Sequence, residues 1–141
     1  MAQPIRFFVY GPLLAGEPEH GKLDGATLVG PRVTVSGYSL VEVGPLAGLV
    51  REGQAAVHGE VYLVEAPTLT RLLGEHPALY ALAPVELEGG EHAETLLLDE
   101  ARARGKRRIR GGDWRTRFGP AGVPGPRPAG PLVTWARTRR R

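Results

Sequence analysis

The chain of 141 residues contains no cysteine and no long apolar run. Without cysteine it can form no disulfide, use no thiolate nucleophile and hold no cysteine-ligated metal. No stretch approaches the roughly 20 apolar residues that a membrane-spanning helix needs. The first 14 residues are too short and too often interrupted by glycine and proline for a secretory signal. We therefore expect a cytoplasmic protein that has no membrane partner.

Acidic residues are almost missing from the last 40 positions, where 13 basic residues accompany a single aspartate. Residues 1–101 have the opposite balance, with 14 acidic and five basic side chains and a net charge of −9. The +12 of the last 40 residues outweighs this and gives the chain its total of +3. The sequence therefore describes an acidic body that carries a basic C-terminal segment.

Glycine and proline are abundant, with 20 and 13 residues, or about 23% of the chain. This composition favours short strands joined by many turns. A chain of this length is about one domain and can bury roughly two-thirds of the surface that it exposes when unfolded. We expect this domain to cover residues 1–115. Residues 116–141 are rich in glycine, proline and arginine, which predicts a mobile or surface-draped tail.

The apolar pattern predicts six short strands and one helix. The helix is expected at residues 67–74, because three leucines share one face and Gly74 suits the C-terminal cap. In residues 33–43 the apolar positions change phase after Gly37, which predicts one strongly bent strand. The other strands are expected at residues 5–10, 46–50, 55–64, 82–87 and 94–98, with turns at 52–54 and 88–91. The predicted strands do not alternate regularly with helices, which indicates the α+β class. We expect a small mixed or antiparallel β-barrel with one or two flanking helices.

The segment from Tyr10 to Leu14 follows directly on the first predicted strand. Gly11 lets the backbone turn there, and such a turn can aim N–H groups into a cavity, where they can hold a carboxylate or a polarised carbonyl. The same residues also suit an ordinary strand-ending turn. The interpretation as a binding loop therefore depends on what accompanies the segment.

Further motifs accompany this loop in a fixed order. The segments read FVYGPLL at residues 8–14, GYSLVEVGP at 37–45, GLV at 48–50, VHGEVY at 57–62 and IRGGDW at 109–114. In order and spacing they resemble the γ-glutamylcyclotransferase-like (AIG2-like) family, over about residues 5–115. An ordered series of motifs is far more specific than any one of them alone.

The resemblance implies a fold, a site and a reaction. The fold is a small barrel with flanking helices around a cavity, and the loop lines this cavity and binds a small γ-glutamyl substrate through backbone amides. One glutamate supplies acid–base catalysis while the α-amino group of the substrate attacks its own γ-carbonyl, which releases 5-oxoproline and an amine. The resemblance implies no metal and no organic cofactor. The implied substrate-binding residues are Tyr10, Gly11, Pro12, Leu13, Leu14 and Tyr80.

The chain departs from the family at the catalytic glutamate. The usual pattern is L-D-x-x-E-G-x-P-x-x-Y, and its glutamate falls on Leu73 when counted from Leu69, or on Gly74 when counted back from Tyr80. Neither residue is acidic. Glu75 is the nearest carboxylate and is therefore our candidate for the catalytic residue. A solvated residue at a helix end would also fit this position.

Two further departures lie around the same cavity. Pro12 stands where the family has serine or threonine, which removes a backbone donor and a hydroxyl and leaves the amides of Gly11, Leu13 and Leu14. Tyr80 is followed by alanine and leucine instead of the family's charged pattern. These departures keep open a second interpretation, a catalytically inactive relative that binds a small acidic metabolite.

A third interpretation rests on the basic segment. Residues 102–117 hold eight arginine and lysine residues, and Trp114, Phe118 and Trp135 are interleaved with basic positions. Phosphate neutralisation together with stacking on aromatic rings would suit nucleic acid or another polyanion. Asp113 and Trp114 are also expected to close one end of the barrel by packing and hydrogen bonding. The four histidines lack the spacing of a metal site.

Overall fold

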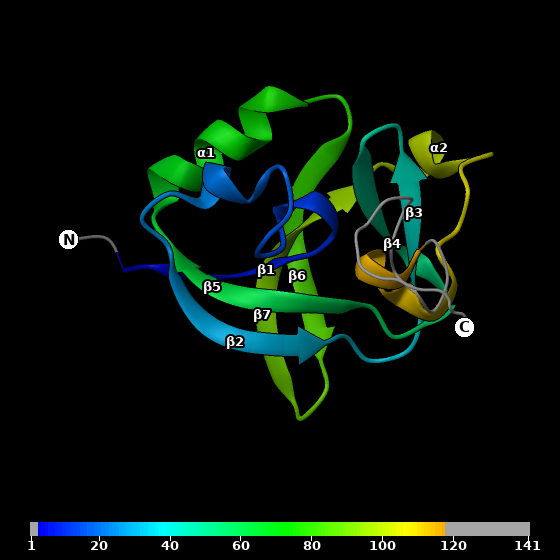
Figure 1. Cartoon of the computed structure of the whole chain (residues 1–141), viewed down its shortest axis with the longest axis horizontal. Coiled ribbons are helices and arrows are strands. Elements are labelled where there is room, and N and C mark those ends of the chain that lie inside the picture. Colours follow the sequence, from blue (N-terminus) through cyan, green and yellow to red (C-terminus); the bar gives the residue numbers. More distant parts are fainter. Residues whose placement is uncertain (1–2, 118–141) are drawn as a thin grey trace, which may run out of the picture.

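Seven strands make up one mixed sheet in the computed structural model, which describes residues 3–117 (Figure 1). The order across the sheet is β2-β5-β1-β7-β4-β3, and β6 pairs with β7 as well. β7 runs parallel to β1 and to β4, whereas the other pairs are antiparallel. In chain order the strands are β1 (Ile5–Val9), β2 (Thr27–Val33), β3 (Tyr38–Val43), β4 (Leu46–Ala55), β5 (His58–Val64), β6 (Tyr80–Leu87) and β7 (Glu91–Leu98).

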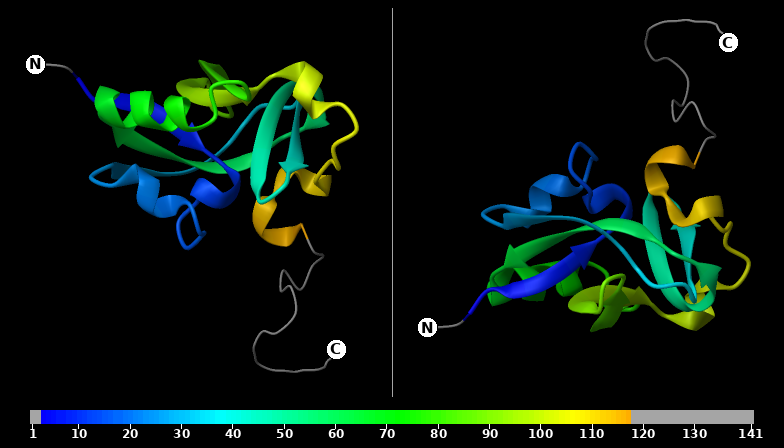
Figure 2. Two further views of the ribbon diagram at one scale, coloured as in Figure 1. Left: turned by 90° about the horizontal axis from the view of Figure 1, so that it is seen from above. Right: turned by 90° about the horizontal axis from the view of Figure 1, so that it is seen from below.

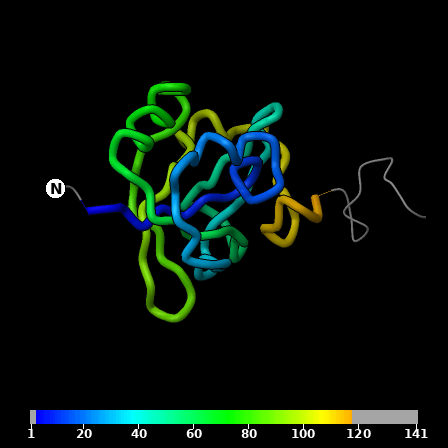
Figure 3. Tube along the Cα trace, turned by 60° about the vertical axis from the view of Figure 1, so that its left-hand side comes forward, coloured from blue at the N-terminus to red at the C-terminus, as the bar shows by residue number. Residues whose placement is uncertain are grey.

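Within residues 3–117, two helices and four short 3-10 turns accompany the sheet. The helices are α1 (Ala66–Glu75) and α2 (Glu100–Ala103), and the turns are η1 (Gly11–Leu13), η2 (His20–Leu23), η3 (Arg110–Gly112) and η4 (Trp114–Thr116). α1 lies beside η2, and the β6–β7 hairpin extends away from them (Figure 3). Among residues 3–117, no helix has both the length and the apolar character that crossing a membrane requires.

The sheet curls into a half-barrel, with β3 and β4 standing steeply against β2 and β5 (Figure 2). This confirms the predicted α+β class and the mixed barrel-like sheet with two helices. β1 lies between β5 and β7, so both of its edges are paired. Successive side chains of a strand point to opposite faces, and Phe7, Phe8 and Val9 have no exposed surface, so both faces of this part of β1 are covered as well.

The helix and the last hairpin lie close to the predicted positions. The helix predicted at residues 67–74 extends to Glu75, and Gly74 is helical and not the cap. The predicted strands 82–87 and 94–98 correspond to β6 and β7. Local patterns define these elements. Leucines recur at helical spacing in α1, and a glycine-rich turn joins β6 to β7.

The single bent strand predicted at residues 33–43 is wrong. Val33 is the last residue of β2, and Tyr38 begins β3 after a turn in which Gly37 has a φ of +116°. β2 itself was not predicted, because Gly30 and Pro31 have the composition of a loop. An edge strand tolerates both residues, since a proline there need not donate to a neighbour and the register shifts between Leu28 and Gly30.

The turn predicted at residues 52–54 is also wrong, because these residues form a large bulge within β4. Tyr38 pairs with Ala55 and the next residue, Ser39, pairs with Val50, so four residues of β4 have no opposite partner on β3. The hydroxyl of Ser39 donates to the carbonyl oxygen of Glu52 at 2.6 Å and closes the bulge. β4 therefore extends beyond residues 46–50, the apolar segment from which the strand was predicted.

Two glycines offer a matched test of this packing. A Cβ on Gly59 would lie 2.3 Å from the carbonyl oxygen of Val9, whereas a Cβ on the helical Gly74 would meet no atom within 4 Å. We expect Gly59→Ala to lower the free energy of unfolding by at least about 2 kcal/mol, because β1 and β5 would have to separate. We expect Gly74→Ala to raise it by up to about 1 kcal/mol, because alanine favours the helix. Urea unfolding of both variants measures the effect, and a neutral Gly59→Ala would contradict the close approach of the strands.

Candidate functional site

One pocket gathers most of the residues that the sequence singles out. It has a free volume of about 510 Å³, mouth included, and lies where the end of β1 meets η1, η2, α1 and the first residues of β4 and β6. Glu75, Tyr10, Pro12, Leu13 and Tyr80 all line it. Most of the lining is apolar, and three charged side chains complete it: Glu19, Lys22 and Glu75.

Two of the predicted binding residues take other positions. Gly11 is buried with a φ of +64°, and a Cβ at this residue would lie 2.5 Å from the Cβ of Ala47. Glycine is therefore required here both for the turn and for the approach of β4. Leu14 does not line the pocket but borders a second hollow of about 570 Å³, together with Arg32, His58 and Arg115.

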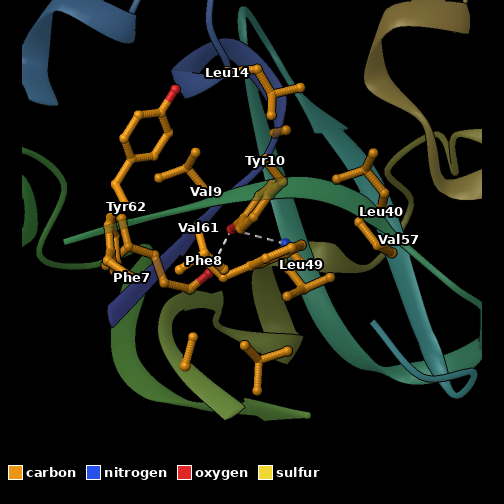
Figure 4. Packing of buried hydrophobic residues seen from close by; sticks show 14 of the residues in the cluster. Phe7, Phe8, Val9, Tyr10, Leu14, Leu40, Leu49, Val57, Val61 and Tyr62 are labelled. Atoms are coloured by element: carbon orange, nitrogen blue, oxygen red, sulfur yellow. Dashed lines mark hydrogen bonds between the residues drawn. The ribbon is translucent and has the colours of Figure 1, made fainter. Parts of the chain in front are cut away.

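The hydroxyl of Tyr10 is fully engaged inside the protein. It donates to the carbonyl oxygen of Leu96 on β7 at 2.5 Å and accepts from the N–H of Leu49 on β4 at 3.1 Å (Figure 4). Burial raises the pKa of Tyr10 well above its ordinary value, and the nearby Tyr80 adds to this. Tyr10 can therefore offer its ring to a ligand, while its hydroxyl holds two strands together.

Tyr80 is engaged in a similar way at the other side of the pocket. Its hydroxyl donates to the carbonyl oxygen of Ala47 at 2.6 Å, and burial raises its pKa to about 12. The ring of His76, which also lines the pocket, lies edge-on to Tyr80 with the ring centres 6.3 Å apart. Both tyrosine hydroxyls thus fix the wall of the pocket, and the ionisable groups that face a ligand must come from elsewhere.

The loop after Tyr10 offers fewer amide donors than the sequence suggests. The N–H of Leu14 donates to the carbonyl oxygen of Gly11 at 3.1 Å, so the expectation that this amide is available is wrong. Pro12 has no N–H, and its carbonyl oxygen accepts from the N–H of Glu19 at 2.9 Å. Of the amides that the sequence suggested, only that of Leu13 belongs to a residue that lines the pocket, because Gly11 is buried against β4.

Glu75 reaches the pocket from the last position of α1. It lies three residues after the buried Leu72, so both side chains point to the same side of the helix. Its carboxylate Oε1 is 2.6 Å from the Nζ of Lys22, and its side chain is 32% exposed. Glu75 is therefore a helical residue whose side chain faces the pocket, although the buried apolar residues of α1, Leu69 and Leu72, lie earlier in the helix.

Lys22 connects the two carboxylates of the pocket. Its ammonium forms ion pairs with Glu19 and with Glu75, and these raise the pKa of Lys22, Glu19 contributing more than Glu75. Sequence analysis did not single out Glu19 or Lys22. A signal was present, because Lys22 is the only lysine among the first 101 residues and follows a glutamate at a spacing of three.

Several elements hold the turn that carries Lys22. Arg71 of α1 donates to the carbonyl oxygen of Lys22 at 2.9 Å, and the Nδ1–H of His20 donates to the carbonyl oxygen of Leu13 at 2.9 Å. From the C-terminal part of the domain, the buried Trp114 donates through its indole N–H to Glu17 at 3.0 Å. Trp114 thus packs and forms a hydrogen bond, as predicted, and it fixes the segment between η1 and η2.

Within the part of the chain that the structure describes, no group of three or more histidine or acidic side chains could hold a metal ion. His58, at the start of β5, is exposed. Of the tail predicted at residues 116–141, residues 118–141 lie outside the described part of the chain. The charged side chains that line the pocket are the two carboxylates of Glu19 and Glu75 and the ammonium of Lys22.

Comparisons with known proteins place the chain in a family. The family model described as "Gamma-glutamyl cyclotransferase, AIG2-like" matches residues 7–116, and the chain belongs to this family. A protein of Vibrio cholerae named "Putative gamma-glutamylcyclotransferase" is 42% identical over 85 residues, which are 59% of this chain and 73% of that protein.

Two solved structures share the fold. A uropathogenic E. coli-specific protein superposes with a TM-score of 0.76 at 23% identity, covering 84% of this chain and 97% of that one. An AIG2-like protein from Mus musculus superposes with a TM-score of 0.65 at 23% identity, covering 92% of this chain and all of that one. At this identity the likeness shows the fold alone.

The role of the Tyr10 hydroxyl can be measured by its removal. Tyr10→Phe leaves the buried N–H of Leu49 and the carbonyl oxygen of Leu96 without their partner. We expect the free energy of unfolding to fall by about 1–3 kcal/mol in urea. Tyr62→Phe is the matched control, because that hydroxyl is only partly buried and donates to Glu60 at 3.0 Å. Equal losses in the two variants would contradict the bridging role of Tyr10.

The raised pKa of Tyr10 also predicts an alkaline loss of stability. Unfolded tyrosine loses its proton near its ordinary pKa of 10.0, whereas buried Tyr10 keeps its proton to a higher pH. The unfolded chain therefore binds fewer protons above pH 10, and stability falls as pH rises, by at most about 1.4 kcal/mol per pH unit for this group. Urea unfolding between pH 9 and pH 11 should give a shallower slope for Tyr10→Phe. Identical slopes for the variant and the wild-type chain would show that Tyr10 makes no contribution.

Proposed function

We propose that the chain releases 5-oxoproline and an amine from a γ-glutamyl compound, with Glu75 as the acid–base residue. The observation that carries this proposal is the position of Glu75, whose side chain lines the same pocket as Tyr10, Pro12 and Leu13 in a member of the γ-glutamylcyclotransferase family. No other carboxylate except that of Glu19 lines this pocket among the described residues.

The proposed reaction makes one bond and breaks one. The nitrogen of the substrate's α-amino group attacks its own γ-carbonyl carbon, and the bond from that carbon to the amine nitrogen then breaks. The α-ammonium nitrogen loses two protons as it becomes the ring amide, and Glu75 passes them one after the other to the departing nitrogen, so that the amine leaves as an ammonium ion. Atoms balance without water or a cofactor, because the ring nitrogen of 5-oxoproline replaces the amine nitrogen on the carbonyl carbon.

The pocket supports this reaction by holding one conformation of a flexible substrate. Nucleophile and electrophile belong to one molecule, so the main requirement is a folded-over chain in which the amine meets the carbonyl. A mainly apolar wall closed by Tyr10 and Tyr80 restricts the space for other conformations. The tetrahedral oxyanion needs N–H donors, and the amide of Leu13, which lines the pocket, is the candidate in the loop.

A product assay tests the proposal. We expect the purified chain to release 5-oxoproline from at least one compound in a panel of γ-glutamyl dipeptides, γ-glutamylamines and glutathione fragments. We expect Glu75→Gln to lower kcat at least about 100-fold, because the amide cannot accept the proton. The variant should remain folded, since an exposed ion pair such as Lys22–Glu75 contributes at most about 1 kcal/mol.

Glu65→Gln is the matched control for this experiment. Glu65 precedes the first turn of the same helix, is exposed, and its side chain makes no capping hydrogen bond. The control should keep wild-type kcat. Wild-type activity in Glu75→Gln would remove Glu75 from the mechanism. A wild-type chain that binds 5-oxoproline but turns over no member of the panel would favour the inactive relative that binds a small acidic metabolite.

A further inference from the structure

We propose that Lys22 recognises the α-carboxylate of the substrate and that this recognition releases Glu75 for catalysis. The inference rests on the proposed function, because it names the substrate group that the charged edge of the pocket binds. It gives Lys22 a role in specificity and Glu19 a role in setting the strength of that interaction.

The contacts of Lys22 are the first observation. Its ammonium touches the carboxylates of Glu19 and Glu75 at the same time, the latter at 2.6 Å. Among the described residues that line the pocket, Lys22 is the only lysine or arginine. A negatively charged group that enters the pocket therefore meets one fixed positive charge, and this charge is Lys22.

The charge pattern is the second observation. Glu19, Lys22 and Glu75 alternate in sign and sum to −1 when ionised. The α-carbon of a γ-glutamyl compound carries a carboxylate beside an ammonium, and these two charges are complementary to Lys22 and to one of its neighbouring glutamates. The substrate carboxylate can thus pair with Lys22 while the substrate ammonium pairs with a carboxylate. The substrate ammonium, which must lose a proton, then lies next to a carboxylate that can accept it.

The exposure of the ion pair is the third observation. The side chains of Lys22 and Glu75 are 34% and 32% exposed, and ion pairs that water can reach exchange partners at little cost. Glu19 is tied to Lys22 by the short chain between them, whereas Glu75 reaches Lys22 from α1. A ligand that enters between these elements therefore separates Lys22 from Glu75 and leaves Lys22 with Glu19.

The position of Lys22 does not depend on these ion pairs alone. Its carbonyl oxygen accepts a hydrogen bond from Arg71 of α1 at 2.9 Å, and the preceding turn is bound to η1 through the N–H of Glu19. The backbone of η2 thus stays in place when a side-chain partner changes. When the substrate carboxylate replaces that of Glu75 beside Lys22, only side chains have to move.

The first experiment compares two substrates on three forms of the chain. The substrates are the best γ-glutamylamine of the activity panel and the same compound with its α-carboxylate converted to a carboxamide. The forms are the wild type, Lys22→Met and Lys106→Met, the last being the control because Lys106 is exposed and is the only other lysine of the chain. We expect wild type and control to prefer the free carboxylate at least about 10-fold in kcat/KM.

In Lys22→Met we expect this preference to fall to about 3-fold or less, mainly through a higher KM for the free carboxylate, with little change for the carboxamide. Lys22→Arg should retain most of the preference, because the charge remains. Equal losses for both substrates in Lys22→Met would overturn the inference and assign Lys22 to positioning Glu75. A wild type that does not distinguish the two substrates would overturn it as well.

The second experiment measures binding without turnover. The probe is 5-oxoproline, which keeps the carboxylate and lacks the ammonium, and its carboxamide is the reference ligand. By calorimetry we expect Lys22→Met to weaken 5-oxoproline binding at least about 10-fold and Lys106→Met to leave it unchanged. Glu19→Gln should tighten binding, because it removes a competing negative charge from Lys22. Binding that is unchanged in Lys22→Met, or unchanged or weaker in Glu19→Gln, would contradict the inference.

The two experiments separate this inference from the proposed function. If no γ-glutamyl compound is turned over but 5-oxoproline binding depends on Lys22, the proposed reaction fails and the carboxylate site stands. If turnover occurs and depends on Glu75, while both Lys22 variants treat the two substrates as the wild type does, the reaction stands and the role of Lys22 is refuted.

Discussion

The hydroxyl of Tyr10 reinforces the junction of β4 and β7, whose backbones pair at Leu49 and Leu97. β6 occupies one edge of β7, and the other edge is shared by β1, which pairs at Glu94, and by β4, which pairs at Leu97. Between these two points the hydroxyl donates to β7 and accepts from β4, and so takes the place of a main-chain hydrogen bond between the strands. A hydrogen bond buried in this way is strong, and an unpaired group there is costly. Because Tyr10 is also the residue at which the pocket loop begins, the direction of that loop depends on the same contact.

Electrostatics around the pocket are local. The acidic residues of the body outnumber the basic ones, so the overall field of residues 1–101 does not attract an acidic ligand. Lys22, between two glutamates, places a positive charge in the pocket of this acidic body. An ion that touches Lys22 feels this charge more strongly than the distant carboxylates, because salt screens the distant charges. The backbone loop contributes less than its glycine suggests, since the amide of Leu14 is already bonded and Pro12 has none. Side chains of η2 and α1 supply the charge that the loop lacks.

Sequence reasoning succeeded where the signal is local and failed where distant segments decide. The helix with its leucine face and the hairpin of β6 and β7 follow from spacing and turn residues within a few positions. Counting along one motif led to Leu73 or Gly74, and Glu75 was chosen as the nearest carboxylate; its side chain lines the pocket. β2 was missed because Pro31 is acceptable only at the edge of a sheet, which the sequence does not display. Lys22 was missed because its setting depends on Arg71, 49 residues away in the chain.

The bond between Trp114 and Glu17 spans 97 residues and has a consequence for how the protein is made. The segment that carries Lys22 is fixed in part by η4, which is among the last elements of the domain to be synthesised. A nascent chain that has emerged only as far as β7 already holds every strand of the half-barrel, but it lacks this outer support. During translation the strands can therefore pair before the pocket is fully framed, because the bond from Trp114 to Glu17 forms only after residue 114 has left the ribosome.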